Sequence, residues 1–222
     1  GLPVFVVDYR LAPEHPFPTA AGDVAAGWDW LLTQGYAAGD LVIAGDSAGG
    51  HLTAMALQTR WQEDYGLPAD PFRAAVLVSG LYELEPLRYS YLQPMIQLDD
   101  GIIRRNSPAF SAQPCATPAL ITWGADEPPE FERQAMSYHA AWQAAGARPE
   151  DVTTIRAPSP RRVSTIFICR RLVFWASSTM TKAWLSVRPR MKAIGAASIS
   201  PLSRRRCTSS APRMSFSASQ IG

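Results

Sequence analysis

The 222-residue sequence has few cysteines and histidines and no long apolar run. Its three cysteines, Cys115, Cys169 and Cys207, are far apart and odd in number, which argues against a disulfide scaffold and a cysteine metal site. No apolar stretch approaches the roughly 18 residues of a membrane span, and no signal peptide opens the chain. We therefore expect a cytoplasmic protein that has no membrane association and needs neither a metal ion nor another cofactor.

Acidic residues are missing from the end of the chain. Residues 1–151 hold all 19 acidic residues and 8 of the 21 lysines and arginines, a net charge of 8 − 19 = −11, whereas residues 152–222 hold the other 13 basic residues and no acid. The composition therefore divides the chain into a domain, 1–156, and a basic tail, 157–222.

Three interpretations of this tail compete. It could be an arm that binds nucleic acid, an unusual C-terminal subdomain, or the product of translation out of frame. We favour the third, because folded domains rarely lack acids over such a length and the basic residues are scattered among apolar ones. We therefore expect no nucleic-acid partner and a poorly ordered tail.

The first 156 residues alternate between apolar strands and amphipathic helices. Strands are expected at 4–8, 41–44, 74–79, 119–123 and 151–155, and helices at 19–33, from 48 through 57, and at 130–145. Continuous apolar strands between helices are typical of a mainly parallel sheet with helices on both faces. The predicted fold class is α/β. Since Gly1 is not an initiator methionine and residues 2–7 already form an apolar run, we expect the chain to begin inside the domain.

The segment Gly45-Asp46-Ser47-Ala48-Gly49-Gly50 lies between a predicted strand and a predicted helix. A serine on such a tight turn is exposed, and small residues two positions either side let the strand and helix backbones approach. The following amide, of Ala48, lies at a helix N-terminus, where it can stabilise a developing oxyanion. The pattern therefore predicts a nucleophile elbow with Ser47 as the nucleophile.

This elbow, extended to Leu52, resembles that of the hormone-sensitive-lipase-like esterases and the arylformamidases (kynurenine formamidases), both α/β-hydrolases. Further matches lie at 8–18 for the esterases, and at 79–87, 106–108 and 129–134 for the arylformamidases. The resemblance covers residues 1–156. It implies a serine hydrolase that takes small carboxylic esters or N-formyl aryl amides and forms an acyl-enzyme on Ser47.

A triad in this fold runs serine, acid, histidine along the chain. Two adjacent carboxylates, Asp126 and Glu127, follow the strand 119–123. Asp126 matches the family acid by its position after Gly124, and we favour it; counting back from Glu130 gives Glu127 instead.

The base is missing from the expected loop after the last strand. The three histidines, His15, His51 and His139, lie in the proline-rich segment, on the elbow helix and on the helix after the acid, and structural roles suit each better. Read in another frame, the codons for residues 164–169 permit Asn-His-Phe. We therefore predict a frame slip between residues 156 and 164, which the coding DNA would show.

Two further features qualify the prediction. The His-Gly-Gly loop that supplies a second oxyanion donor in this family would precede Gly1. Residues 80–113 form an aromatic insertion, which is either a lid over Ser47 or plain packing on the sheet. The preferred interpretation is a hydrolase that is inactive as translated because it lacks its base. The alternatives are a non-catalytic scaffold that binds a ligand or partner, and a nucleic-acid-binding protein that uses the basic tail. The oligomeric state of the chain stays open.

Overall fold

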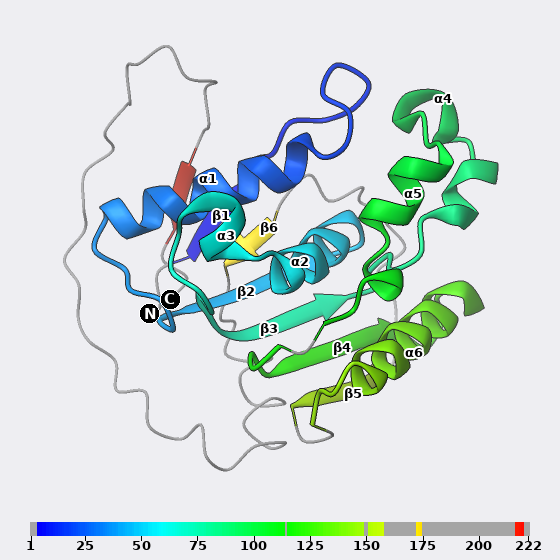
Figure 1. Ribbon diagram of the computed structural model, residues 1–222. Helices are drawn as coiled ribbons and strands as arrows, with labels where there is room; N and C mark the ends of the chain where they lie inside the picture. The colour runs from blue at the N-terminus through cyan, green and yellow to red at the C-terminus, as the bar shows by residue number, and fades with distance from the viewer. Residues whose placement is uncertain (1–3, 114, 149–150, 158–171, 175–215, 220–222) are drawn as a thin grey trace.

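The computed structural model describes residues 4–113, 115–148, 151–157, 172–174 and 216–219. Within them the strands form one seven-stranded sheet in the order β5-β4-β3-β2-β6-β1-β7 (Figure 1). The strands are β1 (Val4–Val7), β2 (Leu41–Asp46), β3 (Phe72–Val78), β4 (Ala119–Gly124), β5 (Val152–Ala157), β6 (Leu172–Phe174) and β7 (Phe216–Ser219). The helices are α1 (Thr19–Thr33), α2 (Ala48–Gln58), α3 (Trp61–Tyr65), α4 (Gln93–Ile96), α5 (Asp100–Asn106) and α6 (Pro129–Ala144), with 3₁₀ turns η1 (Glu85–Tyr89) and η2 (Pro108–Phe110).

The predicted α/β class is confirmed by strands β2 to β5, which pair in parallel. Between β2 and β1 lies β6, which is antiparallel to both, and β7 pairs antiparallel with β1. Most of the tail, and with it the predicted frame slip, lies outside the described residues. Its two described segments, β6 and β7, join the sheet.

One hydrophobic cluster joins the sheet to its long helices. It packs Trp28 of α1, Leu52 of α2 and Trp142 of α6 against Ile43 and Ile121 of the strands. Neighbouring strand residues point to the opposite face, where a smaller cluster contains Ala44, Val76 and Leu120. Among the described residues, α1, α2 and α6 therefore cover the first face; the helices expected on the second face are not among them.

The insertion, residues 80–113, is more ordered than the sequence suggests. We expected irregular chain there, but it contains η1, α4, α5 and η2. These short elements share a small core of Leu84, Leu98 and Ile103, against which Phe17 also packs. Figure 1 places α4 and α5 beyond the end of the sheet toward which β3 and β4 run. In the described part of the chain, no helix has the length and apolar character needed to cross a membrane.

Candidate functional site

Ser47 occupies the junction between β2 and α2. Its backbone angles are φ 54° and ψ −114°, in a region that non-glycine residues adopt only under strain. The Ser47 amide donates to the Val78 carbonyl at 2.9 Å, and the Ser47 carbonyl accepts from the His51 amide at 3.1 Å. The Ser47 side chain does not cap α2, so its hydroxyl is not engaged by the helix that it precedes.

Glycines allow the strand and helix at this junction to approach closely. A Cβ on Gly45 would overlap the Gly49 carbonyl group, the contact that the sequence pattern predicts. A Cβ on Gly50 would lie 2.8 Å from the Gly80 Cα, on the segment after β3. This second approach joins residues 30 positions apart, and the motif alone did not indicate it.

The ends of three parallel strands bring the site together. Ser47 follows β2, Ser79 follows β3, and the segment with the two candidate acids follows β4. The Ser79 amide donates to the Thr122 carbonyl at 2.8 Å, and the Ala125 amide donates to the Ala157 carbonyl at the end of β5 at 2.9 Å. In open α/β sheets this carboxyl edge is where ligands bind.

The two candidate acids differ sharply in their surroundings. The Glu127 Oε2 atom accepts a hydrogen bond from the Ser79 hydroxyl at 2.7 Å and another from the Gly124 amide at 2.6 Å. Asp126 is exposed and has no hydrogen bond or ion pair within the described residues. A carboxylate that orients a histidine must itself be held, so this geometry favours Glu127, which was our second choice from the sequence.

Asp46 adds a second carboxyl group close to Glu127. Burial, and after it the negative charge of Glu127, raise the pKa of Asp46 above its ordinary value. We call residues 125–128, between β4 and α6, the acid loop. The elbow and the acid loop therefore interact electrostatically, in addition to lying at the ends of strands in one sheet.

None of the three histidines contacts Ser47 or either candidate acid through a hydrogen bond between side chains in the described residues. The His51 Nε2 atom lies 2.8 Å from the Asn106 carbonyl oxygen, so Nε2 carries a proton, and Phe17 packs edge-on against the ring. Burial lowers the pKa of His51. His15 is exposed and His139 is half-buried on α6. The position expected for the base, after β5, lies outside the described residues.

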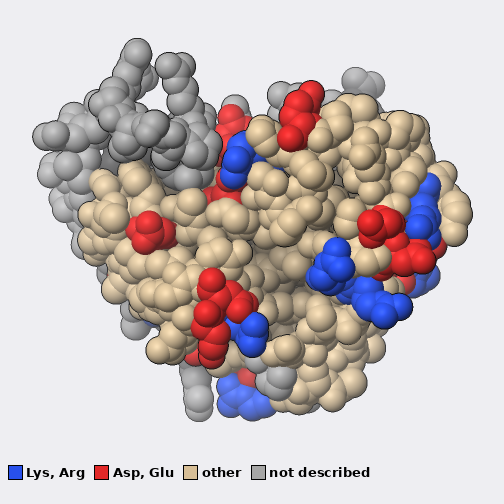
Figure 2. All heavy atoms as spheres, turned by 45° about the horizontal axis from the view of Figure 1, so that its top comes forward, with Lys and Arg blue, Asp and Glu red and all other residues tan. Residues whose placement is uncertain are grey.

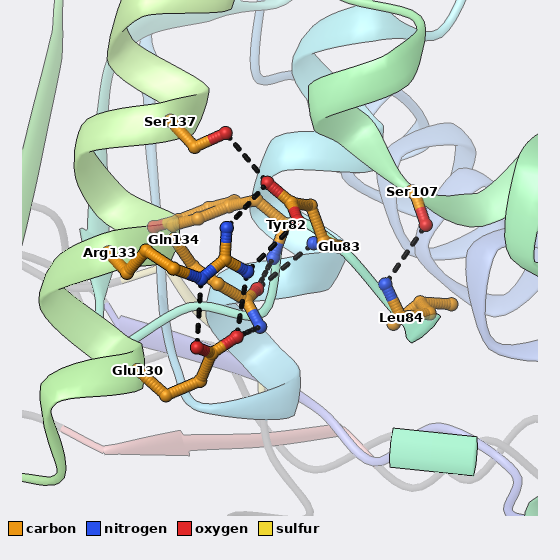
Figure 3. Close-up of polar contacts among 8 residues, drawn as sticks. All are labelled: Tyr82, Glu83, Leu84, Ser107, Glu130, Arg133, Gln134 and Ser137. Atoms are coloured by element: carbon orange, nitrogen blue, oxygen red, sulfur yellow. Dashed lines mark hydrogen bonds and ion pairs between the residues drawn. The ribbon is translucent and has the colours of Figure 1, made fainter. Parts of the chain in front are cut away.

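Helix α6 holds the start of the insertion through a polar network (Figure 3). The Gln134 Oε1 atom, on a side chain that is 1% exposed, accepts from the amides of Tyr82 at 2.7 Å and Glu83 at 2.9 Å. Arg133 pairs with Glu83 at 2.9 Å and with Glu130 at 2.7 Å, and this guanidinium lowers the pKa of Glu83.

The network matters for the site because α6 begins two residues after Glu127. One helix thus joins the acid loop to the insertion. The sequence analysis missed the roles of Ser79, Glu83 and Gln134. All three residues stand within segments that match the arylformamidases, but their types are common and their partners are distant along the chain.

The insertion divides its aromatic residues between core and surface. Tyr82 is fully buried and stacks on Tyr138 with ring centroids 4.5 Å apart. Tyr89 and Tyr91 are 80% and 77% exposed. Tyr82 therefore packs in the core, as the simpler of the two interpretations expects. The role of the rest of the insertion as a lid over Ser47 stays a prediction.

Charges on the described surface are mixed. Figure 2 shows acidic and basic side chains close together at several places on the face that it presents. Ion pairs of this kind include Arg88 and Asp100 of the insertion, whose side chains lie 2.6 Å apart. The described residues on this face form no continuous basic patch of the kind that binds nucleic acid.

A shallow pocket lies at the opposite edge of the sheet, near the starts of β3 and β4. Its lining includes Trp61, Phe72, Cys115 and Thr117, and burial raises the pKa of the Cys115 thiol. It is separate from Ser47. Within the described residues, no group of three or more histidine, cysteine or acidic side chains is arranged to hold a metal ion.

Comparison with known proteins agrees with the geometry. A family model described as alpha/beta hydrolase fold matches residues 1–156. A kynurenine formamidase of Danio rerio is 30% identical over 160 residues, which are 69% of this chain and 54% of that protein. Esterase LipU of Mycobacterium tuberculosis is 43% identical over 97 residues, 44% of this chain and 31% of that protein.

Solved structures give the same result. An esterase from the bacterial hormone-sensitive lipase family is similar with a TM-score of 0.57 and 26% identity, over 68% of this chain and 54% of that one. The chain spans about half the length of the kynurenine formamidase and of this esterase structure.

Proposed function

Because the chain belongs to the α/β-hydrolase family, we propose that it is built as a serine hydrolase for small carboxylic esters or N-formyl aryl amides. The observation that carries this proposal is Ser47, held at φ 54° between β2 and α2, at the sheet edge where the Glu127 carboxylate is also held. Both similar kinds of protein, the kynurenine formamidase and the esterases, bear names that agree with acyl transfer.

In the proposed reaction the Ser47 oxygen attacks the substrate carbonyl carbon, and the hydroxyl proton passes to a histidine base. The Ala48 amide, at the start of α2, donates to the oxyanion. The base returns the proton to the leaving alcohol or amine, and water then releases the acid from Ser47 by the reverse sequence. Glu127 would orient the base and stabilise its charged form.

The position of the histidine base is itself part of the proposal. Strand β5 ends beside the acid loop, where the Ala125 amide binds the Ala157 carbonyl, so a loop that follows β5 in the unshifted frame would emerge at this edge. We propose that the histidine belongs to this loop. The chain as translated would then have little or no activity.

The test begins with the coding DNA around codons 150–170. If a frame there encodes a histidine after β5, the restored chain should react with a fluorophosphonate at Ser47 at least about 100-fold faster than the translated chain. Ser47→Ala in the restored chain should abolish the labelling. A restored chain that stays unlabelled would exclude the serine-hydrolase mechanism.

A second candidate function is that of a non-catalytic scaffold. It is favoured by the three histidines, because none of their rings makes a hydrogen bond to the Ser47 side chain in the described residues. If no frame encodes a histidine after β5, and the chain still binds an aryl ester or formamide without turnover, the scaffold is the better description.

An active chain would also allow the two substrate classes to be separated, by comparing its rate of turnover of p-nitrophenyl acetate with that of an N-formyl aniline.

A further inference from the structure

Ser79, directly after β3, adopts a conformation that its residue type does not favour. Its φ is 46°, in the left-handed region where glycine is preferred and other residues are strained. The residue is 6% exposed, and its amide is already bound to the Thr122 carbonyl. A glycine would satisfy the backbone at least as well, so the serine side chain has a separate role.

Within the described residues, the hydroxyl of Ser79 makes one hydrogen bond, and its partner is the proposed acid. It donates to the Glu127 Oε2 atom at 2.7 Å, and the Gly124 amide donates to the same oxygen at 2.6 Å. Hydrogen bonds to a carboxylate are among the stronger ones in proteins. Two donors from different strand ends therefore hold one carboxylate oxygen, while Oε1 has no hydrogen-bond partner in the described residues.

Glu127 needs such donors because a second carboxyl group lies near it. Asp46 is half-buried and is influenced by the charge of Glu127. Like charges repel more strongly where water is partly excluded. Without the Ser79 hydroxyl, the Glu127 carboxylate would keep only the Gly124 amide as a donor, so this flexible side chain could turn more easily toward solvent, where the neighbouring Asp126 is exposed.

We propose that Ser79 is a positioning residue, whose hydroxyl holds the Glu127 carboxylate at the carboxyl edge of the sheet, turned so that Oε1 serves the base. The role of Glu127 in this statement rests on the proposed function. The hold itself is a structural property that can be measured without turnover.

Ser79→Gly separates the hydroxyl from the backbone. Glycine suits φ 46° and keeps the amide that binds Thr122, so the variant should fold and retain the wild-type Tm within a few degrees. Ser79→Ala also lacks the hydroxyl but keeps the strain, and it should melt lower than Ser79→Gly. Ser107→Ala is the matched control, because the buried Ser107 hydroxyl accepts a hydrogen bond from the Leu84 amide and makes none to the acid.

Amide hydrogen exchange provides the first measurement. In Ser79→Gly we expect the Gly124 amide to exchange about 10-fold faster, because its acceptor is no longer held, while Ile121 of the same strand keeps its wild-type rate. Ser107→Ala should change neither. Unchanged exchange at Gly124 in Ser79→Gly would overturn the proposal.

Hydrolysis of p-nitrophenyl acetate provides the second measurement of the role of Ser79. In an active chain, Ser79→Gly should lower kcat about 10-fold with little change in KM, since a misplaced acid affects the chemical step rather than binding. A wild-type kcat in Ser79→Gly would show that the serine is merely structural. A chain that carries the restored histidine and still shows no turnover counts against the proposed function alone, and the exchange at Gly124 then still decides the role of Ser79.

Discussion

The elbow and the acid loop lie at the same edge of the sheet, yet they are held in different ways. At the elbow, glycine backbones in direct contact and one positive φ angle set the position of Ser47. In the acid loop, side-chain and amide hydrogen bonds set the position of Glu127. Backbone packing leaves a residue pattern that a sequence shows. A hydrogen bond between Ser79 and Glu127 leaves none, because serine and glutamate are common and 48 residues separate them.

The largest expected effect concerns the two carboxylates of the acid loop. In an active chain, Glu127→Gln should lower kcat/KM by about 10³-fold, because a neutral amide cannot stabilise the charged base. Asp126→Asn should stay within about 2-fold of the wild type, as expected for an exposed side chain that has no hydrogen bond or ion pair to the described residues. Ester hydrolysis by the two purified variants tests which carboxylate is the acid. A larger loss of kcat/KM in Asp126→Asn would show that Asp126, the residue favoured from the sequence, is the acid.

The next effect tests the backbone packing of the elbow. Gly45→Ala should destabilise the protein by about 3 kcal/mol or more, since its Cβ would overlap the Gly49 carbonyl group and neither backbone can move freely. The control is Gly22→Ala in α1, where a Cβ meets no atom within 4 Å; it should stabilise the protein by about 0.5–1 kcal/mol. Urea denaturation measures both. Equal free energies of unfolding for Gly45→Ala and Gly22→Ala would mean that β2 and α2 can move apart at the elbow without cost.

The smallest effect concerns the electrostatic contact between the two regions. Because the folded state raises the pKa of Asp46, the native protein disfavours the ionised form, and stability from this group is lost as pH rises through the raised value. Asp46→Asn should therefore raise the Tm at pH 7 by about 2 °C. The gain should disappear at low pH, below the ordinary pKa of an aspartate, where the carboxyl group is neutral in both states.

Asp29→Asn serves as its control, since Asp29 is exposed on α1 and should leave the Tm unchanged at either pH. Thermal melting followed by circular dichroism is sufficient. A gain that persists at low pH would assign the effect to packing rather than charge.

Much of the fold could be predicted from the sequence. The expected boundaries of α1, β4 and α6 agree with the structure within one residue, because long apolar periodicities report burial directly. The short helices α4 and α5 were not predicted. Their few apolar residues show no sustained period, and only their shared core with Phe17 accounts for their packing.

By itself the sequence determined the α/β class, the family and the elbow at Ser47, because each depends on local periodicity or on glycines a few residues apart. Only the tertiary structure showed that Glu127 is hydrogen-bonded while Asp126 is exposed, and only it showed that Ser79 and Asp46 belong to the same edge. The physical reason is that these relations are made between the ends of parallel strands. Strand pairing brings together residues that are dozens of positions apart, and no local pattern records which of two adjacent carboxylates receives the hydrogen bonds.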